Sequence, residues 1–167
     1  VSSNSAAVET SENWYFVGRS AELLKELQRT AGRLTLDAEK LNTFAQSPQF
    51  NWSTHAWYLD SVRGHINKAG TLLDELQGMR DGVTPWQRQA IDRITPVAAE
   101  AAAHTEAAIR FLNANQGRHF VPEYRDSLTM IADRATEMKQ RVDNYVNYAD
   151  TKQKHERAEK SLEVQND

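Results

Sequence analysis

Cysteine is absent from the 167 residues of this sequence. The absence excludes thiol nucleophiles, disulfides, zinc sites built on cysteine, iron–sulfur clusters and covalently attached haem. It does not identify the cellular compartment, because proteins of every compartment can lack cysteine.

Long apolar runs and an excess of positive charge are also missing. The formal net charge is -3, and side chains of both signs are spread along the chain, so no basic face of the kind that binds phosphate backbones is expected. Nucleic acid is therefore not an expected partner. No uncharged apolar run approaches the roughly 18 residues that cross a bilayer, and we expect no membrane span in this chain.

The sequence lacks the common catalytic patterns: Ser or Thr arranged with His and Asp, a glycine-rich phosphate loop, and paired carboxylates in apolar surroundings. Ser53, Thr54 and His55 are adjacent in the sequence, but neighbours on a helix point about 100° apart, so adjacency does not align a nucleophile with a base. The sequence predicts no enzyme.

Helical periodicity is the strongest feature that is present. Between Tyr124 and Ala149 the apolar residues alternate at spacings of four and three, which forms one apolar stripe along a long helix. Such a helix needs partners that bury the stripe. Similar stripes predict helices at residues 20–46, 52–80 and 85–114, with the fourth helix at 121–150.

The boundaries of these helices are marked by local signals. Thr84-Pro85-Trp86-Gln87 has the form of a capping box with proline at the first helical position. Pro96 predicts a kink in the third helix rather than a domain break. Because the four helices have similar lengths and short connections, we expect an all-α, antiparallel up-down-up-down four-helix bundle.

The chain ends differ from the bundle in composition. Residues 1–19 are predicted to be a flexible leader with an aromatic segment, residues 20–150 the bundle, and residues 151–167 a charged helical tail. The small and polar residues at the beginning resemble a mature start after removal of a signal peptide, so we expect a periplasmic or secreted protein. An artificially trimmed chain would look the same.

Histidines and aromatic residues gather at one end of the predicted bundle. His55, His104, His119 and Trp57 are the candidates for a pocket that binds a small molecule, haem or a metal. The alternative, which we favour, is that large rings simply fill the bundle end. Carboxylate di-iron bundles repeat a Glu-x-x-His motif, which this chain lacks, and the three histidines include no close pair for zinc. We therefore expect neither a cofactor nor a metal. His65 and His155 are predicted to be solvated.

Trp14-Tyr15-Phe16-Val17 is the other unusual segment. Exposed aromatic residues of this kind anchor protein partners. The interpretation we favour is a lid that folds back on Trp86, Tyr145 and Tyr148, with the first helix beginning near Ser20, because four exposed apolar residues favour aggregation.

The function predicted from the sequence is a non-enzymatic structural or protein-interaction bundle. Its partner would bind the aromatic segment at Trp14–Val17 or the charged tail. The alternative function is a bundle that binds a small molecule, haem or a metal at the end rich in histidine and aromatic residues.

Overall fold

The computed structural model describes residues 11–49, 51–115 and 122–164. Four long helices and one short 3-10 helix make up the regular structure in these ranges. They are α1 (Trp14–Ala45), α2 (Trp52–Gly78), η1 (Arg80–Gly82), α3 (Pro85–Ala114) and α4 (Pro122–Val164). The predicted all-α four-helix fold is confirmed. The part of the predicted leader at residues 1–10 lies outside the described residues.

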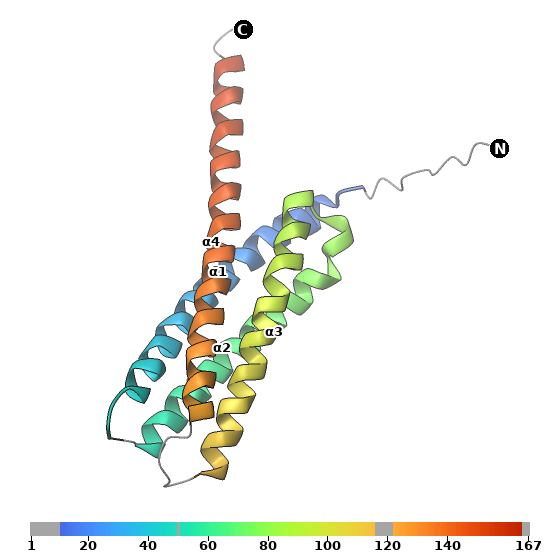
Figure 1. Ribbon diagram of the computed structural model, residues 1–167. Helices are drawn as coiled ribbons and strands as arrows, with labels where there is room; N and C mark the ends of the chain where they lie inside the picture. Colours follow the sequence, from blue (N-terminus) through green and yellow to red (C-terminus); the bar gives the residue numbers. More distant parts are fainter. Residues whose placement is uncertain (1–10, 50, 116–121, 165–167) are drawn as a thin grey trace, which may run out of the picture.

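The four helices alternate in direction (Figure 1). α1 packs against α2 and α4, and α3 packs against the same two helices, while α1 and α3 make few contacts with each other. Each helix therefore has two main neighbours, as at the corners of a square. The end of α1 and the start of α2 lie at the same end of the bundle as the end of α3 and the start of α4 (Figure 1). The start of α1, the α2–α3 connection and the exit of α4 belong to the opposite end.

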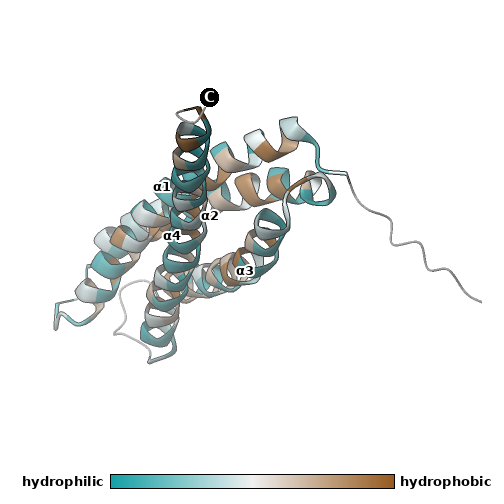
Figure 2. Ribbon diagram, turned by 90° about the horizontal axis from the view of Figure 1, so that it is seen from above, coloured by the Kyte–Doolittle hydropathy of each residue, from teal (hydrophilic) through white to brown (hydrophobic). Residues whose placement is uncertain are grey.

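The apolar stripes meet in one core. Leu34 of α1, Ile94 of α3 and Ile131 of α4 are each 0% exposed. Of the stripe expected on α4, six members are buried, and Tyr145 and Ala149 at its end are partly buried. Figure 2 shows brown apolar residues interspersed with teal hydrophilic residues along the helices, whereas the projecting end of α4 is mostly hydrophilic. The stripes therefore identify the buried face of each helix.

Local signals in α3 behave largely as predicted. The Thr84 hydroxyl accepts from the Gln87 backbone N–H at 3.4 Å, and the Gln87 side-chain oxygen accepts from the Thr84 backbone N–H at 3.2 Å. This is the reciprocal capping box. α3 continues through Pro96 without a break. The Thr95 hydroxyl donates to the carbonyl oxygen of Ile91 at 2.7 Å, so it bonds back along the same helix instead of capping a second one.

α4 is the longest helix, with 43 residues. From residue 151 to residue 164 every side chain is exposed. This segment projects alone beyond the other three helices (Figure 1), and we call residues 151–164 the α4 arm. The predicted charged helical extension is confirmed. None of the described helices combines the length and the apolar character that crossing a bilayer requires.

Candidate functional site

The aromatic segment at residues 14–17 forms the first turn of α1. The Asn13 side-chain oxygen accepts from the backbone N–H groups of Tyr15 and Phe16 at 3.0 and 3.4 Å. Asn13 is therefore the N-cap, and the expected start near Ser20 is wrong by six residues. Gly18 does not interrupt the helix. Ser20, near which the helix was expected to begin, lies inside it and is buried.

Asn13 also joins this turn to the connection between α2 and α3. Its backbone N–H donates to the carbonyl oxygen of Gly82 at 2.8 Å. The Phe16 ring lies against Gly82, where an added Cβ would be 2.5 Å from Phe16 Cδ2. One helix turn farther in, the buried Gln87 side chain donates to the carbonyl oxygen of Val17 at 2.9 Å. The start of α1 is thus held in place by backbone, ring and side-chain contacts.

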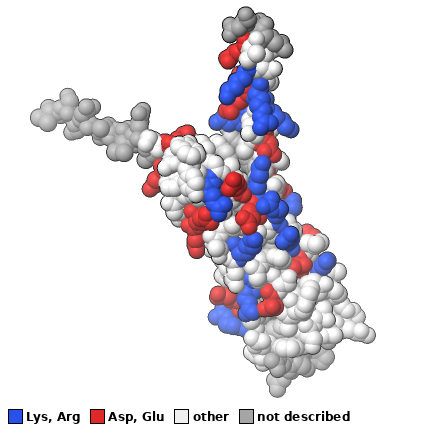
Figure 3. Space-filling view, turned by 180° about the vertical axis from the view of Figure 1, so that it is seen from behind, with Lys and Arg blue, Asp and Glu red and all other residues white. Residues whose placement is uncertain are grey.

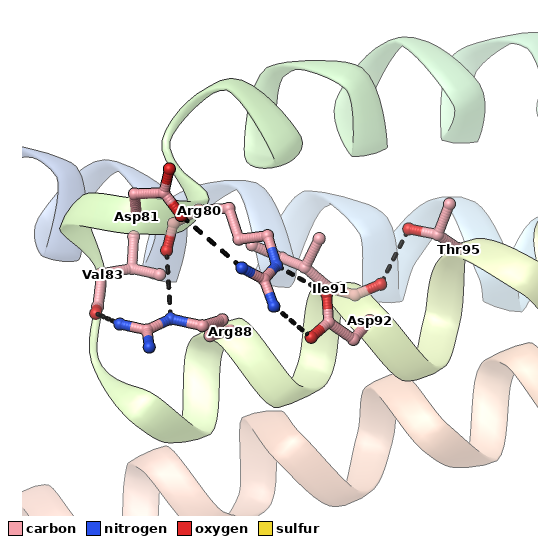
Figure 4. Close-up of polar contacts among 7 residues, drawn as sticks. All are labelled: Arg80, Asp81, Val83, Arg88, Ile91, Asp92 and Thr95. Carbon is pink, nitrogen blue, oxygen red and sulfur yellow. Dashed lines mark hydrogen bonds and ion pairs between the residues drawn. The ribbon is translucent and has the colours of Figure 1, made fainter. Parts of the chain in front are cut away.

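Arginine side chains brace the α2–α3 connection (Figure 4). The Arg80 guanidinium donates to both carboxylate oxygens of Asp92 at 2.7 and 2.6 Å. This hydrogen bonding lowers the pKa of Asp92, so the pair stays charged. Arg88 donates to the carbonyl oxygens of Arg80 and Val83, both at 3.4 Å. These bonds close the turn that supports Asn13 and Phe16.

Trp14 and Tyr15 point away from this support. Trp14 is 86% exposed and Tyr15 is 58% exposed. Their rings pack edge to face with centroids 6.2 Å apart. A groove of about 470 Å³ runs beside them toward Arg19 and Glu75, which form an ion pair with an N···O distance of 2.9 Å. The turn therefore presents two large rings next to charged side chains.

The predicted lid is not present. Trp86 packs edge to face with Tyr148, with ring centroids 5.7 Å apart. The exposure of Trp14 and Tyr15 means that these two rings do not cover that pair. Only Phe16 and Val17 of the segment turn inward, where both are partly buried. The lid is wrong because Asn13 starts the helix early, and a helix directs successive side chains to different faces.

A second groove lies where α4 separates from the bundle. Its volume is about 360 Å³, and its walls include Val17 of α1, Trp86 of α3 and Gln153 of α4. The α4 arm forms one wall of this groove. The exposed turn of α1 and the arm thus belong to the same end of the bundle, which we call the α1-start end.

The other end of the bundle holds the histidine candidates. His55 is 1% exposed, and its Nδ1 atom lies 2.8 Å from the hydroxyl oxygen of Tyr124. Burial lowers the pKa of His55 and raises the pKa of Tyr124, so both groups are neutral near pH 7. This pair is a buried polar bridge between α2 and α4.

Trp57 and His104, the other histidine-end candidates in the described part of the chain, do not converge on His55. Trp57 is 65% exposed on the surface, and His104 is partly buried on α3. Within the described ranges no hydrogen bond or ring contact joins His104 to His55. Among the described residues, there is no group of three His, Asp or Glu side chains that could hold a metal ion. His119 lies outside the described residues.

Sequence reasoning missed a polar cluster between α1 and α2. Asp37 accepts from the Ser61 hydroxyl at 2.6 Å and lies 3.1 Å from His65 Nε2. The prediction that His65 is simply solvated is therefore wrong. Ser61 and His65 are four residues apart on one helix face, and that spacing was the available signal. Because Asp37 stands between Ser61 and His65, the order does not match a nucleophile activated by histidine. The cluster links two helices.

In comparisons with known proteins, no protein-family model, no curated protein and no solved structure matches this chain.

Proposed function

We propose that this chain is a non-enzymatic interaction module whose α1-start end binds a protein partner. The observation that carries the proposal is the first turn of α1, which leaves Trp14 86% exposed and Tyr15 58% exposed. Tryptophan and tyrosine are enriched among the residues that dominate binding energy at protein interfaces. Rings exposed to this extent contribute little buried area to the bundle, which favours a role in binding.

The support beneath the two rings favours a ready-made site over a flexible strip. The Asn13 cap, its bond to Gly82 and the Gln87 contact with Val17 fix the backbone of this turn. A rigid anchor loses less conformational entropy on binding than a mobile segment does. The partner would therefore meet rings whose direction is already set.

The charges beside the rings favour a partner with polar groups around an apolar pocket. Arg19 forms ion pairs with Glu22 and Glu75 at the edge of the groove that Trp14 lines. Protein interfaces commonly combine an aromatic centre with a polar rim. The α4 arm, with its charges of both signs, adds a second polar wall at the same end.

The test is quantitative binding to a partner isolated from the native source. A partner would be captured on the intact chain, identified, purified and titrated against variants. We expect the double variant Trp14→Ala/Tyr15→Ala to weaken binding at least tenfold, as for other aromatic anchors. Trp57→Ala is the matched control, because it removes an exposed tryptophan from the opposite end. Equal affinities for the intact chain and the double variant would contradict the proposal.

The ligand-binding alternative stays a prediction. The described geometry gives it little support, because His55 is buried against Tyr124 while Trp57 faces solvent. Metal analysis and an absorption scan of protein from the native source test it, since stoichiometric metal or a haem absorption band would favour it. Export also stays a prediction, which cell fractionation of the native source tests.

A further inference from the structure

The corner of the bundle where α1 meets α2 is free of charged side chains over a long stretch. Residues 41–59 contain no Asp, Glu, Lys or Arg, although such residues make up 26% of the chain. Figure 3 shows uncharged surface at the lower right of the molecule, whereas blue and red side chains lie along the middle and the upper part of that face. We call the described residues 41–49 and 51–59 the neutral corner.

Aromatic rings lie on the outside of the neutral corner. Phe44 of α1 is 40% exposed and Trp57 of α2 is 65% exposed. The Tyr58 ring links them, with its centroid 5.2 Å from that of Phe44 and 4.8 Å from that of Trp57. This cluster joins the two helices on their solvent side. Leu41 and Leu59, each 1% exposed, fill the core beneath the cluster. The exposed parts of the outer rings are therefore not needed to fill that core.

We propose that the neutral corner inserts into the interfacial region of a neutral, zwitterionic lipid bilayer. Tryptophan and tyrosine gather at membrane interfaces, where an apolar ring body and a polar tip both find a suitable environment. The exposed polar side chains of the corner are amides and hydroxyls, including Gln46, Asn51 and Ser53. They can hydrogen-bond with headgroups without the cost of desolvating a charge.

Charge complementarity favours this occupant over a charged one. A corner without acidic or basic side chains neither attracts nor repels a headgroup layer of zero net charge, whereas binding to anionic lipid draws on Lys and Arg. The nearest charged residues along the two helices, Lys40 and Asp60, lie four residues before Phe44 and three residues after Trp57. They limit insertion to about the last helical turn.

The shape of the neutral corner favours a bilayer over a second copy of the chain as its binding partner. The corner is the outer end of α1 and α2 with the described residues between them (Figure 1). A specific interface between two copies needs complementary surfaces and roughly 1,000 Å² of buried area, whereas this corner protrudes. A fluid lipid interface closes around a protruding shape, so the same rings can be buried without a matching cavity.

Sedimentation of the full chain with phosphatidylcholine vesicles tests the proposal. We expect the intact chain to bind these vesicles with little change between low salt and 0.5 M salt, because no charge attraction is involved. Trp57→Ala should weaken partitioning about tenfold, and Trp57→Tyr should restore most of it. Trp14→Ala, the same substitution at the exposed tryptophan of the opposite end, should change partitioning less than twofold. Far-UV circular dichroism of each variant checks that the bundle is intact.

Three results would overturn the proposal. The first is no binding to phosphatidylcholine vesicles, including the case of binding only when anionic lipid is added. The second is an equal loss of binding in Trp14→Ala and Trp57→Ala. The third comes from sedimentation velocity without lipid: if Trp57→Ala abolishes self-association and vesicle binding is absent, the corner is an interface between copies of the chain. The inference uses a different surface from the proposed protein-binding site, and either can fail alone.

Discussion

The two ends of the bundle each expose a tryptophan, and the surroundings of the two rings differ. Trp14 stands beside the ion pairs of Arg19 with Glu22 and Glu75. Trp57 belongs to a corner with no charged side chain between residues 41 and 59. Exposure of one residue type therefore does not specify one kind of partner. The feature that favours a protein at one end and a neutral lipid interface at the other is the charge within each surface, because the neutral corner holds no charged side chain and Asp60 lies at its edge.

The ends also differ in how their polar groups are satisfied. The α1-start end is closed by backbone and arginine contacts around the α2–α3 connection. The opposite end buries His55 and Tyr124 as a neutral pair. A change in pH should therefore act more on the second end than on the first. Substitutions that disturb one end and spare the other can sharpen this contrast.

The largest expected effect is a loss of stability when packing is removed from the core that both ends share. Leu34→Ala should lower the free energy of unfolding by about 2 to 4 kcal/mol, because a fully buried leucine leaves a cavity. Leu36→Ala, two residues along the same helix and 52% exposed in the parent chain, is the matched control. It should change stability by about 0.5 kcal/mol or less. Urea unfolding measures both, and equal losses would contradict the assigned buried face of α1.

A smaller effect confined to the α1-start end is expected for Gly82→Ala. The added Cβ would lie 2.5 Å from Phe16 Cδ2, so the ring must move. Overpacking of this kind costs about 1 to 3 kcal/mol. Gly64→Ala is the control, because nothing lies within 4 Å of a Cβ there, and an alanine in mid-helix should stabilise by about 0.5 to 1 kcal/mol. If Gly82→Ala were also stabilising, the contact between Phe16 and the α2–α3 connection would be wrong.

The smallest effect should appear at the histidine end on acidification. Burial lowers the pKa of His55 below its ordinary value of 6.5. The folded state then holds fewer protons than the unfolded state, so the His55 contribution is complete above pH 6.5 and declines as the pH falls toward the lowered pKa. The stability difference between the parent chain and His55→Gln should therefore shrink from pH 7 to pH 5. Parallel curves for the parent chain and His55→Gln would exclude a buried neutral histidine.

The features that sequence predicted well are those set by residues close along the chain. The reciprocal bonds of Thr84 and Gln87 follow from their spacing and from Pro85 between them. The buried positions of Leu34 and Ile131 follow from helical periodicity alone. α2 ends at Gly78, two residues before the predicted limit, because η1 continues the turn from Arg80.

The features that sequence missed depend on residues far apart. Asn13 caps α1, and its backbone N–H donates to the carbonyl oxygen of Gly82. The sequence around either residue does not indicate that the two lie close together. The helix start expected near Ser20 did not take account of these tertiary contacts. Periodicity placed His55 and Tyr124 on buried faces, but it does not say which buried polar groups pair across helices. Because α1 begins at Trp14 and not near Ser20, the side chains of residues 14–17 point in other directions than expected. Trp14 and Tyr15 therefore form an exposed surface and not a lid.

Photo-crosslinking tests the central claim most directly. A benzophenone amino acid would replace Trp14 in one protein and Trp57 in another, and each would be irradiated in an extract of the native source. If the α1-start end binds a protein partner, position 14 should yield one discrete crosslinked protein. Excess intact chain should compete for that protein, and position 57 should not yield it. The same crosslinked protein from both positions, or none from position 14, would contradict the assignment of the protein-binding site to the α1-start end.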